Sequence, residues 1–135
     1  MKRSWRDVFY TAYEGVVATF RTERNFRIHV LATLVIVAAG WFFDVSQVDW
    51  ILLILAISLV LGTELLNTAV EATVNLFSPD IHPLAKKAKD AAAGAVLISS
   101  LAAAVIGLIV FWDPFWIWFQ ALSSSATSGS SGISR

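Results

Sequence analysis

The chain contains no cysteine, and few of its residues are charged. Without cysteine there is no disulfide framework and no thiolate chemistry, and no zinc-site spacing is present. Asp, Glu, Lys and Arg make up 15% of the residues, whereas soluble domains are nearer to about 25% charged. Hydrophobic residues fill 57% of the 135 positions, which indicates one membrane domain instead of a soluble protein.

The common signatures of nucleotide-binding and hydrolytic enzymes are also absent. The sequence has no GxxxxGK[ST] segment, no GxGxxG segment and no Ser-His-Asp candidate set. These absences argue against a P-loop enzyme and against a triad hydrolase. The N-terminus is too charged, and too short of continuous apolar residues, for a cleaved signal peptide, so we expect none.

Residues 1–27 have the pattern of an amphipathic helix. The segment holds Lys2, Arg3, Arg6, Arg21, Arg24 and Arg27. Its apolar side chains recur at helical spacing on one face. This face consists of Trp5, Val8, Phe9, Ala12, Val16 and Phe20. The pattern predicts a helix that lies in the membrane interface. An ordinary amphipathic helix packed on its own protein remains the alternative.

Three apolar stretches predict a three-helix transmembrane domain over residues 28–112. They are residues 28–43, with a helical lead-in from Arg24, then 50–76 and 84–112. Each can cross the roughly 30 Å hydrocarbon core of a bilayer. Residues 113–122 are rich in Trp and Phe and are expected at the outer interface. The Ser/Gly-rich residues 123–135 are expected to be disordered. The predicted fold class is an all-α membrane protein.

The basic residues also predict the orientation of the chain in the membrane. Every Lys and Arg except Arg135 lies in residues 1–27 or 86–89, and none lies in the segments 44–49 and 113–122. The positive-inside rule therefore places the N-terminus and the 77–90 loop in the cytoplasm. The C-terminus is then expected outside.

Polar residues gather where the second apolar stretch ends, and they share one helical face. They are Glu64, Asn67, Thr68, Glu71 and Asn75. Ionisable groups at membrane depth are costly and are functional candidates by default. Carboxylate and amide oxygens suit Mg²⁺, and Glu23 lies at the right depth to add a second carboxylate. The alternatives are an interhelical hydrogen-bonding role for Glu64 and a solvated helix-end charge at Glu23.

The next helix begins with lysines, and a short loop with Asp80 and His82 precedes it. Lys86 and Lys89 stand one turn apart and could receive phosphates as point charges. Anchoring to anionic lipid headgroups is the alternative for these lysines. A single histidine in a loop has little predictive value by itself.

Three segments carry a resemblance to a known family. They are ERNFRIH (23–29), ELLNTAVEATVN (64–75) and HPLAKKAKDAAAGAVL (82–97). The chain resembles the small integral-membrane prokaryotic diacylglycerol kinase family, and within it the undecaprenol kinase branch, over residues 5–112. The resemblance implies a homotrimer with shared active sites at the cytoplasmic face of the bacterial cell membrane. It also implies an enzyme that uses ATP with Mg²⁺ to phosphorylate a lipid alcohol.

The resemblance also implies roles for individual residues. Glu64 matches the catalytic base, and Glu71 and Glu23 match carboxylates that bind metal and nucleotide. The other matches are Asn67, which lines the site, Lys89 and Asp90, which contact the nucleotide, and the loop of Asp80 to His82. Arg6 and either Tyr10 or Tyr13 align loosely with family residues that close over ATP. Asn75 departs from the family, which usually has Asp there. The loss of this charge is expected either to weaken nucleotide or metal binding or to alter the electrostatics of the helix end, and an active enzyme is still expected.

The resemblance predicts that Glu23 of one chain meets Glu64 and Glu71 of a neighbour. The expected partners are therefore a lipid alcohol, ATP, the membrane and two further copies of the chain, with no nucleic acid. Phosphorylation of diacylglycerol is an alternative to phosphorylation of undecaprenol. A non-enzymatic small membrane protein is a further alternative. A transporter is disfavoured because the polar residues lie at one membrane face instead of midway through the bilayer.

Overall fold

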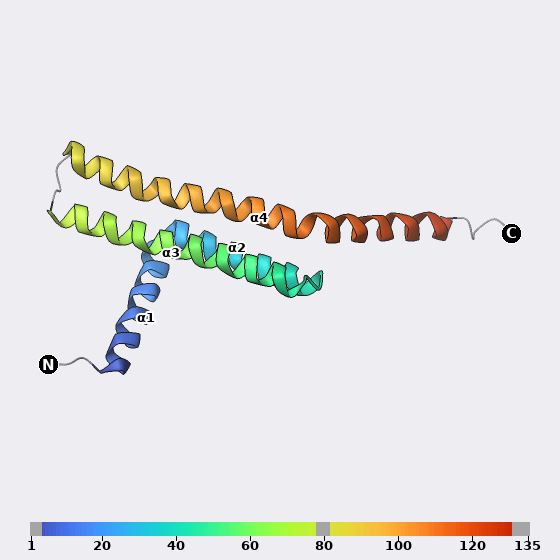
Figure 1. The fold of residues 1–135 in the computed structure, drawn as a ribbon, viewed down its shortest axis with the longest axis horizontal. Coiled ribbons are helices and arrows are strands. Elements are labelled where there is room, and N and C mark those ends of the chain that lie inside the picture. Colours follow the sequence, from blue (N-terminus) through green and yellow to red (C-terminus); the bar gives the residue numbers. More distant parts are fainter. Residues whose placement is uncertain (1–3, 78–81, 131–135) are drawn as a thin grey trace.

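The computed structural model describes residues 4–77 and 82–130, with side chains described up to residue 124. Four helices follow one another: α1 (Trp5–Thr22), α2 (Arg24–Phe42), α3 (Gln47–Phe77) and α4 (Pro83–Ser130). Helices α2, α3 and α4 lie alongside one another, and α1 projects from this bundle at a steep angle (Figure 1). The end of α3 and the beginning of α4 lie at one end of the bundle, and α2 begins part of the way along α3 from this end, where α1 joins it (Figure 1).

Local sequence signals fix where the helices begin and end. Ser4 caps α1 through a reciprocal capping box with Asp7, which satisfies free N–H groups of the first turn. At the opposite end of the bundle, Ser46 donates from Oγ to Oδ2 of Asp49 at 2.7 Å and accepts from the Asp49 N–H. Asp44 adopts a φ of 50° in the same turn, a conformation that Asp tolerates better than most residues.

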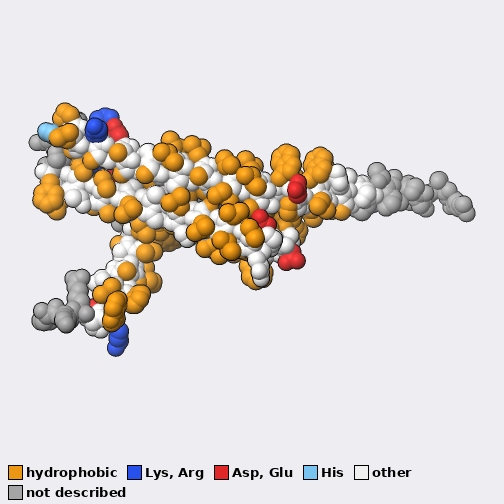
Figure 2. Space-filling model, viewed as in Figure 1, with side chains coloured by type: hydrophobic (Ala, Val, Ile, Leu, Met, Phe, Trp, Pro, Cys, Tyr) orange, Lys and Arg blue, Asp and Glu red, His pale blue; other side chains and the backbone are white. Residues whose placement is uncertain are grey.

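The surface between the two ends is apolar. Helices α2, α3 and α4 each have the length and composition to cross a membrane. Large side chains such as Leu31, Leu55 and Leu101 are about 60% exposed in the single chain. Figure 2 shows hydrophobic side chains along the bundle, with charged side chains near its ends and on α1. The chain is thus a multi-pass, all-helical membrane protein.

The best-packed region lies near the α2–α3 turn. Val45, Leu53 and Val110 form a buried cluster. Partly buried side chains pack around them, and they are Ile36, Phe43, Trp50, Ile106 and Phe111. Gly40 lets the ring of Trp50 approach α2, because a Cβ atom at Gly40 would lie only 2.7 Å from Cη2 of Trp50.

The third membrane helix is longer than the sequence predicts. It was expected over residues 84–112, yet α4 continues through Pro114 to Ser130. Residues 123–130, expected to be disordered, are therefore part of this helix, whereas 131–135 lie outside the described residues. Ser123 and Ser124 each donate from Oγ to a carbonyl three residues earlier. Such bonds satisfy the hydroxyl groups within the helix, and no proline follows Pro114 to end it.

Candidate active site

Glu64 is the best-buried carboxylate among the described residues. Its exposed fraction is 3%. It belongs to the stripe of α3 that points into the bundle, together with Leu53, Ala56 and Val60, all of which are buried. The spacing of three, four and four residues keeps this stripe on one face of the helix. The sequence places a carboxylate at the end of an otherwise apolar stripe, so Glu64 faces the other helices instead of water.

Other titratable groups lie close enough to Glu64 to interact with it electrostatically. They are His29 on α2, Glu71 on α3 and Glu23 between α1 and α2. All belong to the same chain. The structure therefore places Glu23 and Glu71 within electrostatic reach of Glu64, and it adds His29, for which the sequence patterns indicated no role. The position of His29 within the ERNFRIH segment was the only signal for it.

Glu23 occupies the corner between two helices. Its backbone is extended, with φ −96° and ψ 118°, and it ends α1 and precedes α2. Its carboxylate accepts a hydrogen bond from Oγ1 of Thr22 at 3.0 Å. This side chain makes no capping hydrogen bond to the first turn of α2. The carboxylate of Glu23 thus lies at the end of the bundle and is not used as a helix cap.

Asn67 and Glu71 form a pair on α3, about one and two turns beyond Glu64. Nδ2 of Asn67 donates to Oε1 of Glu71 at 3.2 Å. Oδ1 of Asn67 is buried and has no hydrogen-bond partner in the described part of the chain. Such an atom is costly unless a ligand completes it. An unpaired amide oxygen beside a carboxylate offers the hard-oxygen donors that Mg²⁺ prefers.

These donors fit a metal ion only if other ligands complete its shell. Within residues 4–77 and 82–130, no three His, Asp or Glu side chains form a metal-binding group by themselves. Mg²⁺ is commonly held by one or two carboxylates together with substrate phosphates and water. Glu71, Glu23 and Oδ1 of Asn67 are compatible with such a site.

The beginning of α4 carries the charged residues expected to contact the nucleotide. Asp90 pairs with Lys86, whose Nζ lies 2.5 Å from Oδ2, and both side chains are largely exposed. Lys89, expected to act beside Asp90, is half-buried. His82 accepts the N–H of Leu84 at Nδ1, at 3.2 Å, and so helps to begin the helix. Asp80 lies outside the described residues.

Two further expectations concern the edge of the site. Asn75 is exposed near the end of α3. Tyr10 and Tyr13 are exposed on α1, as is Arg6, and α1 projects away from the bundle (Figure 1). The single chain does not bring these three side chains over the carboxylate group.

A hydrogen bond between α3 and α4 lies next to Glu64. Oγ atoms of Thr63 and Ser99 are 2.8 Å apart. Ser99 is 3% exposed, and it also donates to the carbonyl of Val96. Helical spacing alone does not single out this pair, although two consecutive serines in an apolar run are a signal for it. The bond joins the two helices one residue before the buried carboxylate.

The chain is similar to known proteins over most of its length. Residues 10–111 match the family model described as prokaryotic diacylglycerol kinase. Over 103 residues the chain is 44% identical to the undecaprenol kinase of Bacillus subtilis, covering 76% of this chain and 84% of that protein. It is 34% identical over 104 residues to the diacylglycerol kinase of Escherichia coli K12, covering 77% of this chain and 85% of that protein. The match includes every candidate residue from Glu23 to Asp90, and the chain belongs to the prokaryotic diacylglycerol kinase family of lipid kinases.

Proposed function

We propose that this lipid kinase transfers the γ-phosphoryl group of ATP to the hydroxyl of undecaprenol and produces undecaprenyl phosphate. The observation that carries the proposal is the burial of Glu64 among apolar helices, within electrostatic reach of Glu23 and Glu71. A base in this position would meet a lipid hydroxyl that enters from the bilayer. The 44% identity to an undecaprenol kinase supports the choice of lipid.

The transfer itself is simple in its covalent steps. The lipid oxygen bonds to the γ-phosphorus, the bond from that phosphorus to the bridging oxygen breaks, and ADP leaves. Glu64 accepts the hydroxyl proton as this bond forms. Phosphoryl transfer otherwise depends on positioning and on neutralising charge. Glu64 is therefore assigned as the base.

The remaining polar residues would hold the nucleotide. Glu71, Glu23 and Asn67 would hold Mg²⁺, which, when bound, neutralises charge on the phosphates. Lys89 would contact a phosphate from the beginning of α4, with Asp90, His82 and Asp80 nearby in sequence. Glu64 and Glu71 are seven residues apart, or about 10 Å along the helix. This separation suits a lipid hydroxyl at one residue and a nucleotide at the other.

We also propose that this end of the bundle faces the cytoplasm and that α1 lies in the membrane interface. The exposed side chains of Trp5 and Phe9 on α1 support an interfacial position. The distribution of Lys and Arg supports the orientation. Single cysteines in place of Ser46 and Ser78 should then react from opposite sides of sealed cells. Labelling of both from outside would contradict the orientation.

The assembly is proposed to be a homotrimer with active sites that neighbouring chains share. Exposed apolar side chains on α2 and α4, such as Leu34 and Leu108, support contacts with lipid or with further copies. Since Glu23, Glu64 and Glu71 already group within one chain, a neighbour would contribute other residues, such as those of α1.

The decisive experiment measures phosphorylation of two lipids under identical conditions. The purified protein in one detergent receives Mg²⁺-ATP with either undecaprenol or diacylglycerol, and kcat/KM is compared. A higher kcat/KM for undecaprenol is expected. A preference for diacylglycerol would retain the kinase and overturn the proposed substrate. Removal of Mg²⁺ by a chelator should abolish activity with both lipids.

A further inference from the structure

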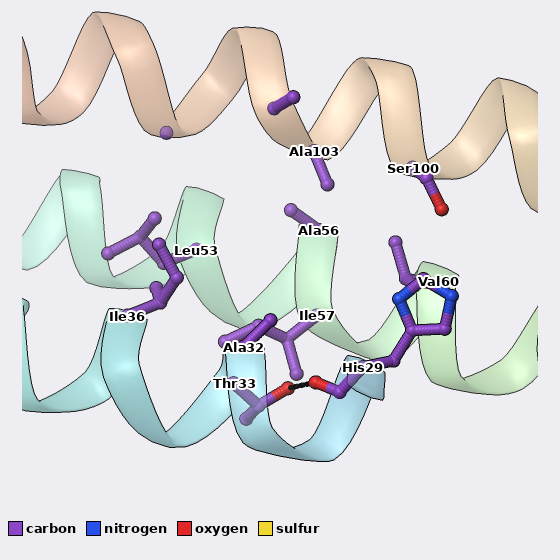
Figure 3. A pocket seen from close by; sticks show the side chains of 12 residues that line it. His29, Ala32, Thr33, Ile36, Leu53, Ala56, Ile57, Val60, Ser100 and Ala103 are labelled. Carbon is purple, nitrogen blue, oxygen red and sulfur yellow. Dashed lines mark hydrogen bonds between the residues drawn. The ribbon is translucent and has the colours of Figure 1, made fainter. Parts of the chain in front are cut away.

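A groove runs between the three membrane helices beside the candidate active site. Its volume is about 240 Å³, and α2, α3 and α4 all line it. Small residues on all three helices leave this space open: Ala32 on α2, Ala56 on α3, and Ala103 and Gly107 on α4. Figure 3 shows labelled side chains from the three helices converging on this space. Apart from a few polar groups, the lining is apolar.

The groove leads toward Glu64. Leu53, Ala56 and Val60 line it along α3, and they belong to the same buried stripe as Glu64. Glu64 follows Val60 by four residues, which is one helical turn. An apolar chain lying along this stripe would therefore bring its end to the carboxylate.

Polar groups are found at the end of the groove nearest to Glu64. His29 lines the groove beside Val60 and Ser100 (Figure 3), and it interacts electrostatically with Glu64. Oγ of Ser100 is buried and has no hydrogen-bond partner in the described part of the chain. An apolar channel with a polar end matches an amphiphile that has one slender chain and a terminal hydroxyl.

We propose that this groove binds the part of the lipid alcohol nearest its hydroxyl and aligns that hydroxyl with Glu64. The proposal rests on the proposed function, and it specifies the single prenyl chain of a polyprenol as the occupant. A second copy of the protein is a poorer occupant, because its apolar helix face would leave the buried Oγ of Ser100 without a hydrogen-bond partner.

The groove would act by alignment more than by affinity. Lipid tails are as apolar as the groove, so moving a chain from the bilayer into it gains little from the hydrophobic effect. Holding the hydroxyl in a reactive geometry can, in contrast, change the rate by orders of magnitude. Blocking the groove should therefore reduce turnover of the lipid and leave the binding of ATP unchanged.

The test places leucine inside and outside the groove at adjacent positions. Ala103→Leu fills the groove, whereas Ala102→Leu makes the same change at an exposed position of α4 that does not line it. We expect kcat/KM for undecaprenol to fall about tenfold to a hundredfold in Ala103→Leu and to stay within twofold of wild type in Ala102→Leu. The KM for ATP should not change in either variant.

A second variant keeps the test decisive if Ala103→Leu does not fold. A Cβ atom at Gly107 would meet no described atom within 4 Å, so Gly107→Leu can extend into the groove without a clash at Cβ. It should reduce kcat/KM for undecaprenol as Ala103→Leu does. If both folded variants match the Ala102→Leu control, the groove proposal is wrong and the proposed function stands. If the wild-type protein phosphorylates no polyprenol, the proposed function is wrong, and the groove proposal that rests on it is wrong as well.

Direct labelling identifies the occupant. A polyprenol with a photoreactive diazirine on the unit next to its hydroxyl should label groove residues, and excess undecaprenol should suppress the labelling. Because the chain has no cysteine, Ala103→Cys also provides a single thiol for crosslinking between copies. Labelling only outside the groove, or an efficient disulfide between Ala103→Cys chains, would overturn the proposal.

Discussion

The two ends of the membrane bundle are built differently. At the α2–α3 turn, Trp50 packs against Gly40 and contacts Trp41, with ring centroids 5.8 Å apart. Phe43 meets Phe111 in the same region. The opposite end contains a buried carboxylate at Glu64 and a buried amide oxygen at Asn67 without a partner in the described residues. One end is packed for stability, and the other keeps polar groups whose burial is costly until a ligand completes them.

This difference matches a division of labour that is common in enzymes. Buried polar groups cost stability, so they persist where binding or catalysis requires them. The packed end can offset that cost through apolar contacts. Substitutions at the polar end should therefore change catalysis with little loss of stability, whereas substitutions at the packed end should have the opposite effect.

The largest effect is expected from removing the base. Glu64→Gln should lower kcat by about 10²–10⁴-fold, the usual contribution of general-base catalysis, because the amide cannot accept the hydroxyl proton. Its affinity for Mg²⁺-ATP should stay near that of wild type. Its thermal stability should not fall, since a neutral amide is cheaper to bury than a carboxylate. Steady-state kinetics, ATP-analogue titration and thermal unfolding in detergent measure these three quantities.

Glu71→Gln is the matched control on the same helix. It removes a proposed metal ligand, so both kcat and the affinity for Mg²⁺-ATP should fall, and the affinity without Mg²⁺ should change much less. A Glu64→Gln enzyme with near-normal kcat would refute the assignment of Glu64 as base. Equal losses of nucleotide affinity in both variants would refute the division of roles between them.

Mixed assemblies test whether the polar end is complete within one chain. Glu23→Gln and Glu71→Gln chains, each inactive, are purified as verified mixed oligomers. Because Glu23 and Glu71 both interact with Glu64 of their own chain, every mixed site should lack one carboxylate and activity should not return. Recovery of activity would show that Glu23 enters the site of a neighbouring chain, as the sequence analysis expected.

The sequence predicts the membrane helices well because their signals are local. Helices α2 and α3 begin and end within a few residues of the expected positions, and α4 begins at Pro83, next to its expected start at Leu84. The predicted end of α4 was wrong. The serine-rich composition suggested disorder, whereas the hydroxyls of Ser123 and Ser124 bond within the helix. Composition does not report such local bonds.

The site was predictable in part. Helical spacing shows that Glu64, Asn67 and Glu71 share a face, because this depends on one helix alone. The position of His29 and the shape of the groove depend on contacts across helices, and no spacing rule within one segment contains that information. The pair of Lys86 and Asp90, in contrast, has the i, i+4 spacing of one helix face, so it was predictable from the sequence. The roles of the carboxylates remain predictions until the variants above are measured.

A smaller effect is expected at the packed end. A Cβ atom at Gly40 would lie 2.7 and 2.9 Å from two atoms of the Trp50 ring, so Gly40→Val should overpack this contact and destabilise the protein by about 1–3 kcal/mol. Gly62→Val is the control on α3, because a Cβ atom there meets no described atom within 4 Å. Thermal unfolding in one detergent compares the two, and kcat is measured well below the transition. Equal stabilities would contradict the importance of the Gly40–Trp50 contact.

The smallest effect is expected where the two regions meet. The Thr63–Ser99 hydrogen bond joins α3 to α4 beside Glu64, and interhelical bonds of this kind in membranes contribute about 0.6 kcal/mol on average. Ser99→Ala and Thr63→Val should each lower stability slightly, and the double variant should lose less than the sum of the two. A double-mutant cycle on thermal unfolding measures this coupling. If the bond also positions Glu64, kcat should fall a few-fold in both single variants and no further in the double variant, with the KM for ATP unchanged. Strictly additive losses in stability and in kcat would show that the two hydroxyls act independently, and that the helices hold Glu64 in place without this bond.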